Sequence, residues 1–514
     1  MVTATAVSTH LSTVVRAVPW AGEHRFVGAG LAGLILLAIG LRLVPIVLVP
    51  SMVWPDEVFQ TSEQAHRLVY GSGLVPWEFQ LGMRSWLLPG VIAALMELSR
   101  IAGDGSDYYI PLIAVSFAAL AAVPVVCCFL WGRRLFGSAG GWIAAAVVAV
   151  APEAVYFGAR TLFETVAAHL LVAAFYVLEP GYRVTSRRRL FGGGVLLGLV
   201  FVLRIQLAPA LVVVAVWTCW GAVRERGPML LAGAAATLAA AAMLDMATLG
   251  YPFASVWRNL IYNVYYGASS TFGVEGWSFY LLGELGVWGG GALTLVLVVA
   301  LGTRRMPLLL AAAVTILAAH SAVAHKEYRF IYPAVLLVMI LAGIGLAQAA
   351  AWGREWLLER GVQGWAATAG LVAVVLSWWC LVSLHVWTGA TLTAYRSGRH
   401  DNLQAASFVA HGQALCGLGL YGADGEDWVN YGGYTYLHRS VPMYWPKDEL
   451  EFEALAAGFD TLVYTKAPPE GSGFMPQRCF GQVCVARRSG GCASLPMLAM
   501  PFPDPVSRLL DRSP

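Results

Sequence analysis

The chain has 514 residues, of which 58% are hydrophobic and only 12% are charged. A soluble protein of this length has about twice that charged fraction, because charged side chains cover its surface. The composition therefore excludes an ordinary soluble enzyme and indicates a polytopic membrane protein. The net charge of +3 is too small to indicate a nucleic-acid partner. The positive residues are almost all Arg, which suggests a bacterial host with a GC-rich genome.

The first apolar stretch, 27–50, follows Arg16 and Arg25 and has no small-residue cleavage site after it. We therefore expect an uncleaved span with a cytoplasmic N-terminus. Ten further stretches of near-span length follow it: about 109–131, 138–156, 163–179, 190–206, 207–223, 229–249, 281–301, 306–324, 331–350 and 363–387. With eleven spans, the Arg clusters of the connecting loops face the cytoplasm, as the positive-inside rule requires. The predicted fold class is an all-α polytopic membrane protein with about 11 transmembrane helices.

One more apolar segment, 85–103, bears on the span count. As a twelfth span it would invert every later loop and place the Arg clusters outside. We expect an interfacial or re-entrant helix here instead. The loops that then share the outer face are 51–108, 157–162, 250–280, 325–330 and 388–514.

The first outer loop begins directly after a span, and its Asp56 and Glu57 lie side by side at the membrane surface. Charges so close to hydrocarbon need a function or a partner. Adjacent carboxylates point in different directions, so one could take a proton from an acceptor hydroxyl while the other binds a metal or orients the base. The alternative is structural, because an Asp after Pro55 suits a helix N-terminus and would cap its N–H groups.

A second charged stretch, 325–329, lies between two apolar runs late in the membrane region. The parity of the spans places it on the same face as Asp56. A positive cluster on the outer side runs against the positive-inside trend, which favours a function for Lys326.

From about residue 395 the sequence becomes mixed and polar, with short β-like runs between Gly/Pro-rich turns. We predict a transmembrane module at 1–390, with its first external loop at 51–108, and a small α/β or β-rich external domain at 391–514. In an oxidising compartment the cysteines of this tail favour one or two disulfides of undetermined pairing. A zinc site is the alternative, but no His lies at ligand spacing near them. These cysteines are Cys416, Cys479, Cys484 and Cys492.

Several elements of the first outer loop occur in a distinctive order and spacing. They are Pro55-Asp56-Glu57-Val58-Phe59-Gln60, Glu63 to His66, Gly71 or Gly73, Pro76-Trp77-Glu78, and Arg84-Ser85 with Pro89. A second motif is His325-Lys326-Glu327-Tyr328-Arg329-Phe330, followed by Tyr332-Pro333. Together they resemble glycosyltransferase family 22, the polyprenyl-phosphate-mannose-dependent mannosyltransferases that build GPI anchors and lipid-linked N-glycans. The resemblance covers about residues 50–345, and the tail after 395 shows no match.

This resemblance implies a GT-C fold, in which a polytopic helical scaffold has its catalytic site at the outer face. It also implies an inverting transfer of mannose from a polyprenyl (dolichyl-type) phosphate donor to a glycolipid or glycan acceptor. The acceptor hydroxyl needs a general base, for which we assign Asp56, with Glu57 as assistant or substitute. Fixed cations would stabilise the leaving phosphate, and the candidates are His325, Lys326, Arg329, Arg84 and Arg204. The candidate substrate-binding residues are Trp77, Glu78, Arg160, Glu327 and Trp277.

Ordinary membrane chemistry offers an alternative for several of these residues, because Arg at span ends snorkels to headgroups and Trp gathers in interfacial belts. The donor has a single phosphate, so we expect no required cofactor and no metal site. The pair Asp56–Glu57 still leaves room for a divalent ion. The expected partners are the lipid-linked donor, the acceptor and the bilayer, with no nucleic acid.

We expect a multi-pass protein of the bacterial inner membrane, or of the endoplasmic reticulum in a eukaryote. The active site and the C-terminal domain would face the periplasm or lumen. Two other classes remain open. Another GT-C enzyme, of the protein O-mannosyl- or arabinosyl-transferase type, also has an acidic pair after its first span. A lipid or sugar transporter would bury charges near the midplane and show two matching halves, and the sequence shows neither.

Overall fold

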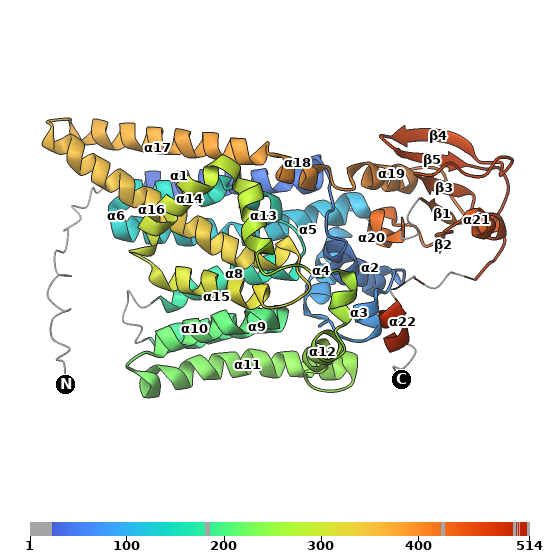
Figure 1. The fold of residues 1–514 in the computed structure, drawn as a ribbon, viewed down its shortest axis with the longest axis horizontal. Helices are drawn as coiled ribbons and strands as arrows, with labels where there is room; N and C mark the ends of the chain where they lie inside the picture. Colours follow the sequence, from blue (N-terminus) through green and yellow to red (C-terminus); the bar gives the residue numbers. More distant parts are fainter. Residues whose placement is uncertain are drawn as a thin grey trace.

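The computed structural model describes residues 23–179, 186–422, 427–496, 500, 502 and 504–510. Long apolar helices run side by side and make up most of the molecule, and a small sheet domain lies beyond one end of them (Figure 1). Short helices of the first outer loop lie between the two parts.

The helices up to the end of the membrane region are α1 Glu23–Leu43, α2 Glu63–Tyr70, α3 Trp77–Gln80, α4 Leu87–Ser99, α5 Ser106–Ala121, α6 Val123–Val150, α7 Pro152–Phe157, α8 Phe163–Leu178, α9 Arg187–Leu203, α10 Ala208–Cys219, α11 Val223–Leu249, α12 Ala254–Leu260, α13 Phe279–Trp288, α14 Ala292–Thr303, α15 Pro307–Ser321, α16 Tyr332–Glu359 and α17 Gly364–Trp387. The later helices are α18 Ala390–Ser397, α19 His400–Ala410, α20 Gly433–Leu437, α21 Glu449–Leu455 and α22 Asp504–Leu510.

By length and composition, six helical stretches of the described residues can cross a membrane. They are Gly28–Leu48, Ser106–Val150, Val223–Leu249, Phe279–Thr303, Tyr328–Glu359 and Gly364–Trp387. Four shorter apolar helices accompany them: Leu87–Ser99, Phe163–Leu178, Ile205–Cys219 and Pro307–Ser321. Every stretch predicted to span lies on a helix, and the total of eleven stays a prediction.

The stretch Ser106–Val150 is a helical hairpin, because Gly137 interrupts α6 with a left-handed φ of 76°. The two arms pack closely, since a Cβ on Gly132 would lie 2.5 Å from the carbonyl oxygen of Gly140. A hairpin at this place agrees with the two separate spans that the sequence predicts, 109–131 and 138–156.

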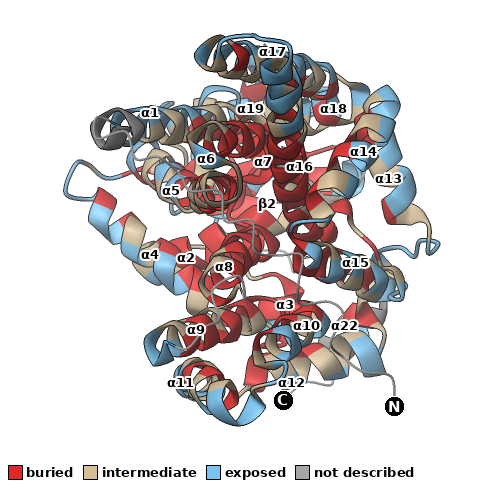
Figure 2. Cartoon of the chain, turned by 90° about the vertical axis from the view of Figure 1, so that its left-hand side faces the viewer, coloured by how far each residue is buried: buried red, intermediate tan, exposed pale blue. Residues whose placement is uncertain are grey.

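Helix α16 is the centre of the bundle and packs against α6, α8, α14, α15 and α17. The backbones of α16 and α14 approach closely at Gly345, which has no side chain. A Cβ added there would lie only 1.8 Å from the Val298 carbonyl oxygen, so a larger residue would not fit. Figure 2 shows α16 and α6 buried in the middle and α1, α11 and α17 at the periphery. The peripheral helices expose large apolar side chains such as Leu231 and Leu381, as helices that face lipid do.

The segment 85–103 forms α4, which has 13 residues. At 1.5 Å per residue it is about 20 Å long, too short for a hydrocarbon core of about 30 Å. It packs against α2 and α5 and exposes Val91 and Leu98. Helix α10, which lies in a predicted span, is shorter still with 12 residues, so length does not distinguish the two and the interfacial or re-entrant placement of 85–103 stays a prediction.

The C-terminal domain is an α/β unit. Its strands are β1 Leu418–Tyr421, β2 Met443–Tyr444, β3 Thr461–Tyr464, β4 Met475–Phe480 and β5 Val483–Arg487. They form a sheet of order β2-β1-β3-β5-β4, in which β1 pairs in parallel with β2 and β3, and β5 pairs antiparallel with β3 and β4. This arrangement confirms the predicted small domain with a sheet.

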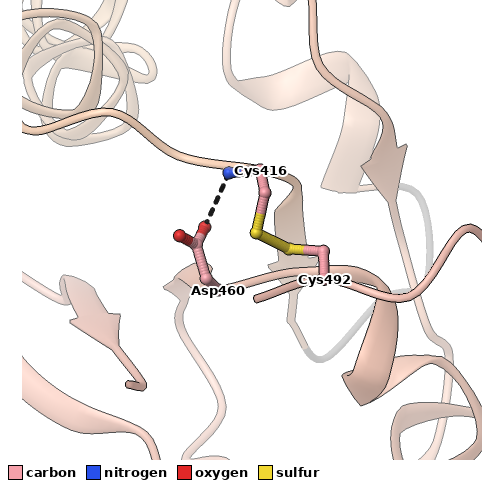
Figure 3. A group of neighbouring side chains, drawn as sticks. All are labelled: Cys416, Asp460 and Cys492. Carbon is pink, nitrogen blue, oxygen red and sulfur yellow. Dashed lines mark hydrogen bonds between the residues drawn. A yellow bond between two sulfur atoms is a disulfide. The ribbon is translucent and has the colours of Figure 1, made fainter. Parts of the chain in front are cut away.

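Two disulfides cross-link this domain, Cys416–Cys492 and Cys479–Cys484, which confirms the predicted use of the four tail cysteines. Cys416 and Cys492 also lie beside Asp460, whose carboxylate accepts a hydrogen bond from the Cys416 N–H at 3.2 Å (Figure 3). Because both sulfurs are bonded to each other, neither is a thiolate that could ligate zinc. The group is therefore a cross-link, and the zinc alternative does not apply to it.

Glu63 of α2 joins the C-terminal domain to the first outer loop. Its buried carboxylate accepts hydrogen bonds from the backbone N–H of Leu74, at 2.8 Å, and from those of Tyr434 and Thr435, at 3.0 and 2.9 Å. The Thr435 hydroxyl adds a fourth, at 2.8 Å. The Glu63 carboxylate also lies close to the backbone of Gly433. A Cβ added to Gly433 would lie 2.6 Å from this carboxylate, so a larger residue would displace it.

We expect Glu63→Ala to lower the free energy of unfolding by about 3 kcal/mol, because it leaves buried N–H groups without an acceptor. Thermal unfolding in detergent and the rate of proteolytic release of the C-terminal domain measure this. The control is Glu453→Ala at an exposed glutamate of α21. Equal stability of the two variants would contradict the role of Glu63.

Candidate active site

A cavity of about 580 Å³ lies where the first outer loop, several helix ends and the C-terminal domain meet. Its lining includes Asp56, Glu78, Arg204, Lys326, Glu327 and Arg329. Residues of the two motifs singled out in the sequence therefore share one cavity, which goes further than the common face that span parity predicted.

Asp56 and Arg329, 273 residues apart, form an ion pair at the floor of this site. The Arg329 guanidinium also binds Glu327 through Nε at 2.8 Å and approaches Glu164 at 3.5 Å. Three carboxylates, those of Asp56, Glu327 and Glu164, therefore surround the buried Arg329 guanidinium. The Asp56 side chain is 29% exposed, so the carboxylate stays accessible from the cavity.

Helix capping does not account for Asp56. The first N–H groups of its turn, those of Glu57 and Val58, donate to the carbonyls of Trp54 and Pro55. The hydrogen bond found for the Asp56 carboxylate among the described residues goes to Arg329. The side chain is thus directed into the cavity rather than back along its own helix.

Glu57 points the opposite way, into the protein interior. Arg160 Nη1 donates to its two oxygens at 2.9 and 2.8 Å, and the same guanidinium donates to Ser51 and stacks 4.1 Å above the Tyr156 ring. Both partners are buried, and neither lines the cavity. The structure therefore places Glu57 and Arg160 outside the lining of this cavity, as an internal ion pair next to Asp56 in the sequence.

All five candidate phosphate-binding cations line the cavity: Arg84, Arg204, His325, Lys326 and Arg329. Arg204 is paired with Glu164 at 2.8 Å. Lys326 Nζ donates to the carbonyls of Glu275 at 2.8 Å and Val323 at 2.5 Å, which ties the 250–280 loop to the end of α15.

His325 has Nδ1 at 2.9 Å from the Gly273 carbonyl and Nε2 at 3.2 Å from Glu327. Burial opposes its charge, but these two bonds outweigh burial and raise the pKa of His325. Burial likewise opposes ionisation of Glu327, whose pKa is nevertheless held well below its usual range by Arg329 and His325. The stretch thus presents cations to the cavity, and the Glu327 carboxylate holds two of them in place.

Of the two tryptophans predicted to bind substrate, one lines the cavity and the other does not. Trp77 lines the cavity and stacks on Phe272 with ring centroids 5.5 Å apart. Trp277 is 73% exposed and lies outside the cavity lining, as an interfacial Trp would.

Sequence reasoning missed residues that complete the wall of the cavity. His320 comes from the end of α15, while Arg399, Trp428 and Phe502 come from the C-terminal part of the chain. No motif marks the last three, and only the packing of the tail onto the first loop brings them to the site.

The Alg9-like mannosyltransferase family matches residues 33–407 of this chain. The chain belongs to this family. Among its relatives, GPI alpha-1,2-mannosyltransferase 3 of Danio rerio is 28% identical over 328 residues, which cover 61% of this chain and 59% of the relative. GPI mannosyltransferase 3 of Yarrowia lipolytica is 26% identical over 350 residues, which cover 65% and 66%. The chain thus matches less than two thirds of the length of these relatives.

This member of the Alg9-like family also resembles the crystal structure of ArnT from Cupriavidus metallidurans bound to undecaprenyl phosphate. The TM-score is 0.58 at 15% identity, over 91% of this chain and 99% of that one. The likeness confirms the predicted GT-C scaffold. The curated relatives named above are eukaryotic, so they do not support the bacterial host that the Arg bias suggested.

Glu78 is a buried carboxyl of the cavity with a strongly shifted proton affinity. Its Oε1 accepts from Gln60 at 2.7 Å and lies 3.8 Å from Arg84. Burial, followed by the negative charge of Asp56, raises the pKa of Glu78 to about 7. The carboxyl is therefore neutral below pH 7 and adds a negative charge to the cavity above it.

We expect the affinity for an anionic ligand to fall by roughly fivefold as the pH rises from 6 to 8, because the Glu78 charge repels it. Titration with farnesyl phosphate at several pH values measures this. In Glu78→Gln this loss of affinity should disappear, because the amide stays neutral at every pH. Glu97→Gln, at a half-exposed glutamate of α4, is the control and should retain the wild-type profile. Identical profiles for wild type and Glu78→Gln would contradict the assignment.

Proposed function

We propose that this chain is a membrane mannosyltransferase that uses a polyprenyl-phosphate-mannose donor of the dolichyl type and a glycolipid or glycan acceptor, with inversion. The observation that carries the proposal is that Asp56 and a cluster of cations line one cavity, where Asp56 forms an ion pair with Arg329. Membership of the Alg9-like mannosyltransferase family supports the sugar. The solved ArnT complex with undecaprenyl phosphate supports a polyprenyl phosphate donor.

In the proposed step, the acceptor hydroxyl oxygen attacks C1 of mannose and gives its proton to the Asp56 carboxylate. The bond between C1 and the phosphate oxygen breaks, and the electron pair leaves with the polyprenyl phosphate. Negative charge grows on that oxygen, and fixed cations stabilise it better than mobile water does. Arg84, Arg204, His325 and Lys326 form this cationic side.

Arg329 belongs both to the cations of the cavity and to the group that contacts the proposed base, Asp56. It holds the Asp56 carboxylate and is itself held by Glu327 and Glu164. We assign Arg329 to orientation of the base and to the field at the leaving phosphate. Glu57 and Arg160 contribute by positioning, because both are buried behind Asp56.

The proposed reaction takes place at the outer membrane surface, on the lumenal or periplasmic side. The first outer loop and the C-terminal domain both belong to that side under the predicted topology. The lipid tail of the donor would lie in the bilayer, beside the apolar faces of the membrane helices.

We expect Asp56→Asn to reduce kcat about 10³-fold, because the amide cannot accept the acceptor proton. The measurement is transfer of labelled mannose from dolichyl-phosphate-mannose, with thermal unfolding as a check on folding. The matched control is Asp107→Asn at an exposed aspartate of the same outer region. Wild-type transfer by Asp56→Asn would overturn the assignment of the base, and no transfer by wild type would overturn the enzyme itself.

We expect transfer to continue within about twofold in excess EDTA, because the donor has one phosphate and protein cations face it. The control is the same assay with added Mg²⁺ or Mn²⁺ in place of the chelator. Loss of activity in EDTA that is restored by either ion would show a divalent requirement and would assign Asp56 to metal binding.

A further inference from the structure

The C-terminal domain supplies one wall of the active-site cavity. Trp428, Val429 and Phe502 line it, together with Arg399 from the segment between α18 and α19. The first three lie beyond residue 407, where the match to the family ends. This wall is therefore not part of the sequence pattern that the chain shares with its family.

The wall is fixed to the loop that carries Asp56. The Trp428 ring meets Phe59 edge to face, with centroids 5.1 Å apart, and Phe59 lies three residues after Asp56. Arg399 donates to the carbonyl of Val53 at 2.5 Å and to Asn430 at 2.6 Å. The wall and the proposed base are thus held at a constant separation.

Two groups of residues in the cavity lining differ in chemical character. The cations that suit a phosphate come from the end of α9, from the 325–329 stretch and from Arg84. The wall of Trp428, Val429 and Phe502 comes from the domain that lies at the far end from the long membrane helices (Figure 1). In an inverting transfer the acceptor hydroxyl approaches the face of the sugar opposite the leaving group. Trp428, Val429 and Phe502 carry no charge, so they suit a neutral acceptor sugar better than a phosphate.

The chemistry of this wall suits a sugar ring. Two aromatic rings and a branched aliphatic side chain offer an apolar surface for the C–H face of a pyranose. Polar groups beside them can bind hydroxyls, among them Gln60 and the Asp56 carboxylate. We propose that Trp428, Val429 and Phe502 form the subsite for the acceptor sugar, so that the C-terminal domain selects the acceptor. This inference rests on the proposed function.

The test is steady-state transfer from dolichyl-phosphate-mannose to octyl α-mannoside, with KM measured separately for donor and acceptor. Val429→Trp fills the subsite from a half-buried position and should raise the acceptor KM at least tenfold while changing the donor KM less than twofold. Trp428→Ala should do the same, and Trp428→Phe should restore most of the acceptor affinity because it keeps a ring.

Val441→Trp is the matched control. Val441 is a half-buried valine that packs against the same apolar cluster as Val429 but does not line the cavity. Its variant should keep both KM values, which separates loss of the subsite from general damage to the domain. A folded Val429→Trp protein with wild-type acceptor KM, or an equal rise in donor KM, would overturn the subsite. Failure of wild type to transfer mannose to octyl mannoside or to any other octyl hexoside would instead overturn the proposed function.

Discussion

The organisation of the site depends on one constraint: charges next to hydrocarbon must be paired within the protein. The Asp56–Arg329 ion pair satisfies it and joins the first outer loop to the start of α16. Glu164 extends the network by binding both Arg329 and Arg204, which adds the N-terminus of α8 and the end of α9. The helices must therefore be packed correctly before the charges can be neutralised. The same packing places cations and the Asp56 carboxylate in the lining of one cavity.

The two adjacent carboxylates have different roles because the backbone sends them in opposite directions. Asp56 faces the cavity and is partly exposed, whereas Glu57 lies in the interior against Arg160. A buried ion pair leaves an uncompensated charge when one partner is removed, so loss of Glu57 would act on folding as well as on the site. Asp56 is the more accessible of the two carboxylates, and its partner Arg329 also contacts Glu327 and Glu164. The arrangement separates the reactive group from the group that holds it.

The C-terminal domain is attached by hydrogen bonds to the loop that carries Asp56. Glu63 accepts hydrogen bonds from its α20 helix, and Arg399 and His400 donate to backbone carbonyls near the first outer loop. These bonds attach the domain directly to the segment that carries Asp56. A domain attached in this way can vary its cavity-facing side chains while the shared helical scaffold stays unchanged. This explains how a tail outside the family match can still contribute to the same site.

The sequence by itself indicated the membrane class, the two charged motifs and their common face, and one or two disulfides among the four tail cysteines. These features follow from hydropathy, span parity and spacing, which are local or additive properties. Only the tertiary structure decided that Glu57 and Arg160 pair in the interior, that Trp277 lies outside the cavity and that Trp428 lies within it. It also decided the pairing Cys416–Cys492 and Cys479–Cys484. The direction of a side chain and its distant neighbours depend on how helices and domains pack, and neither quantity is encoded in spacing along the chain.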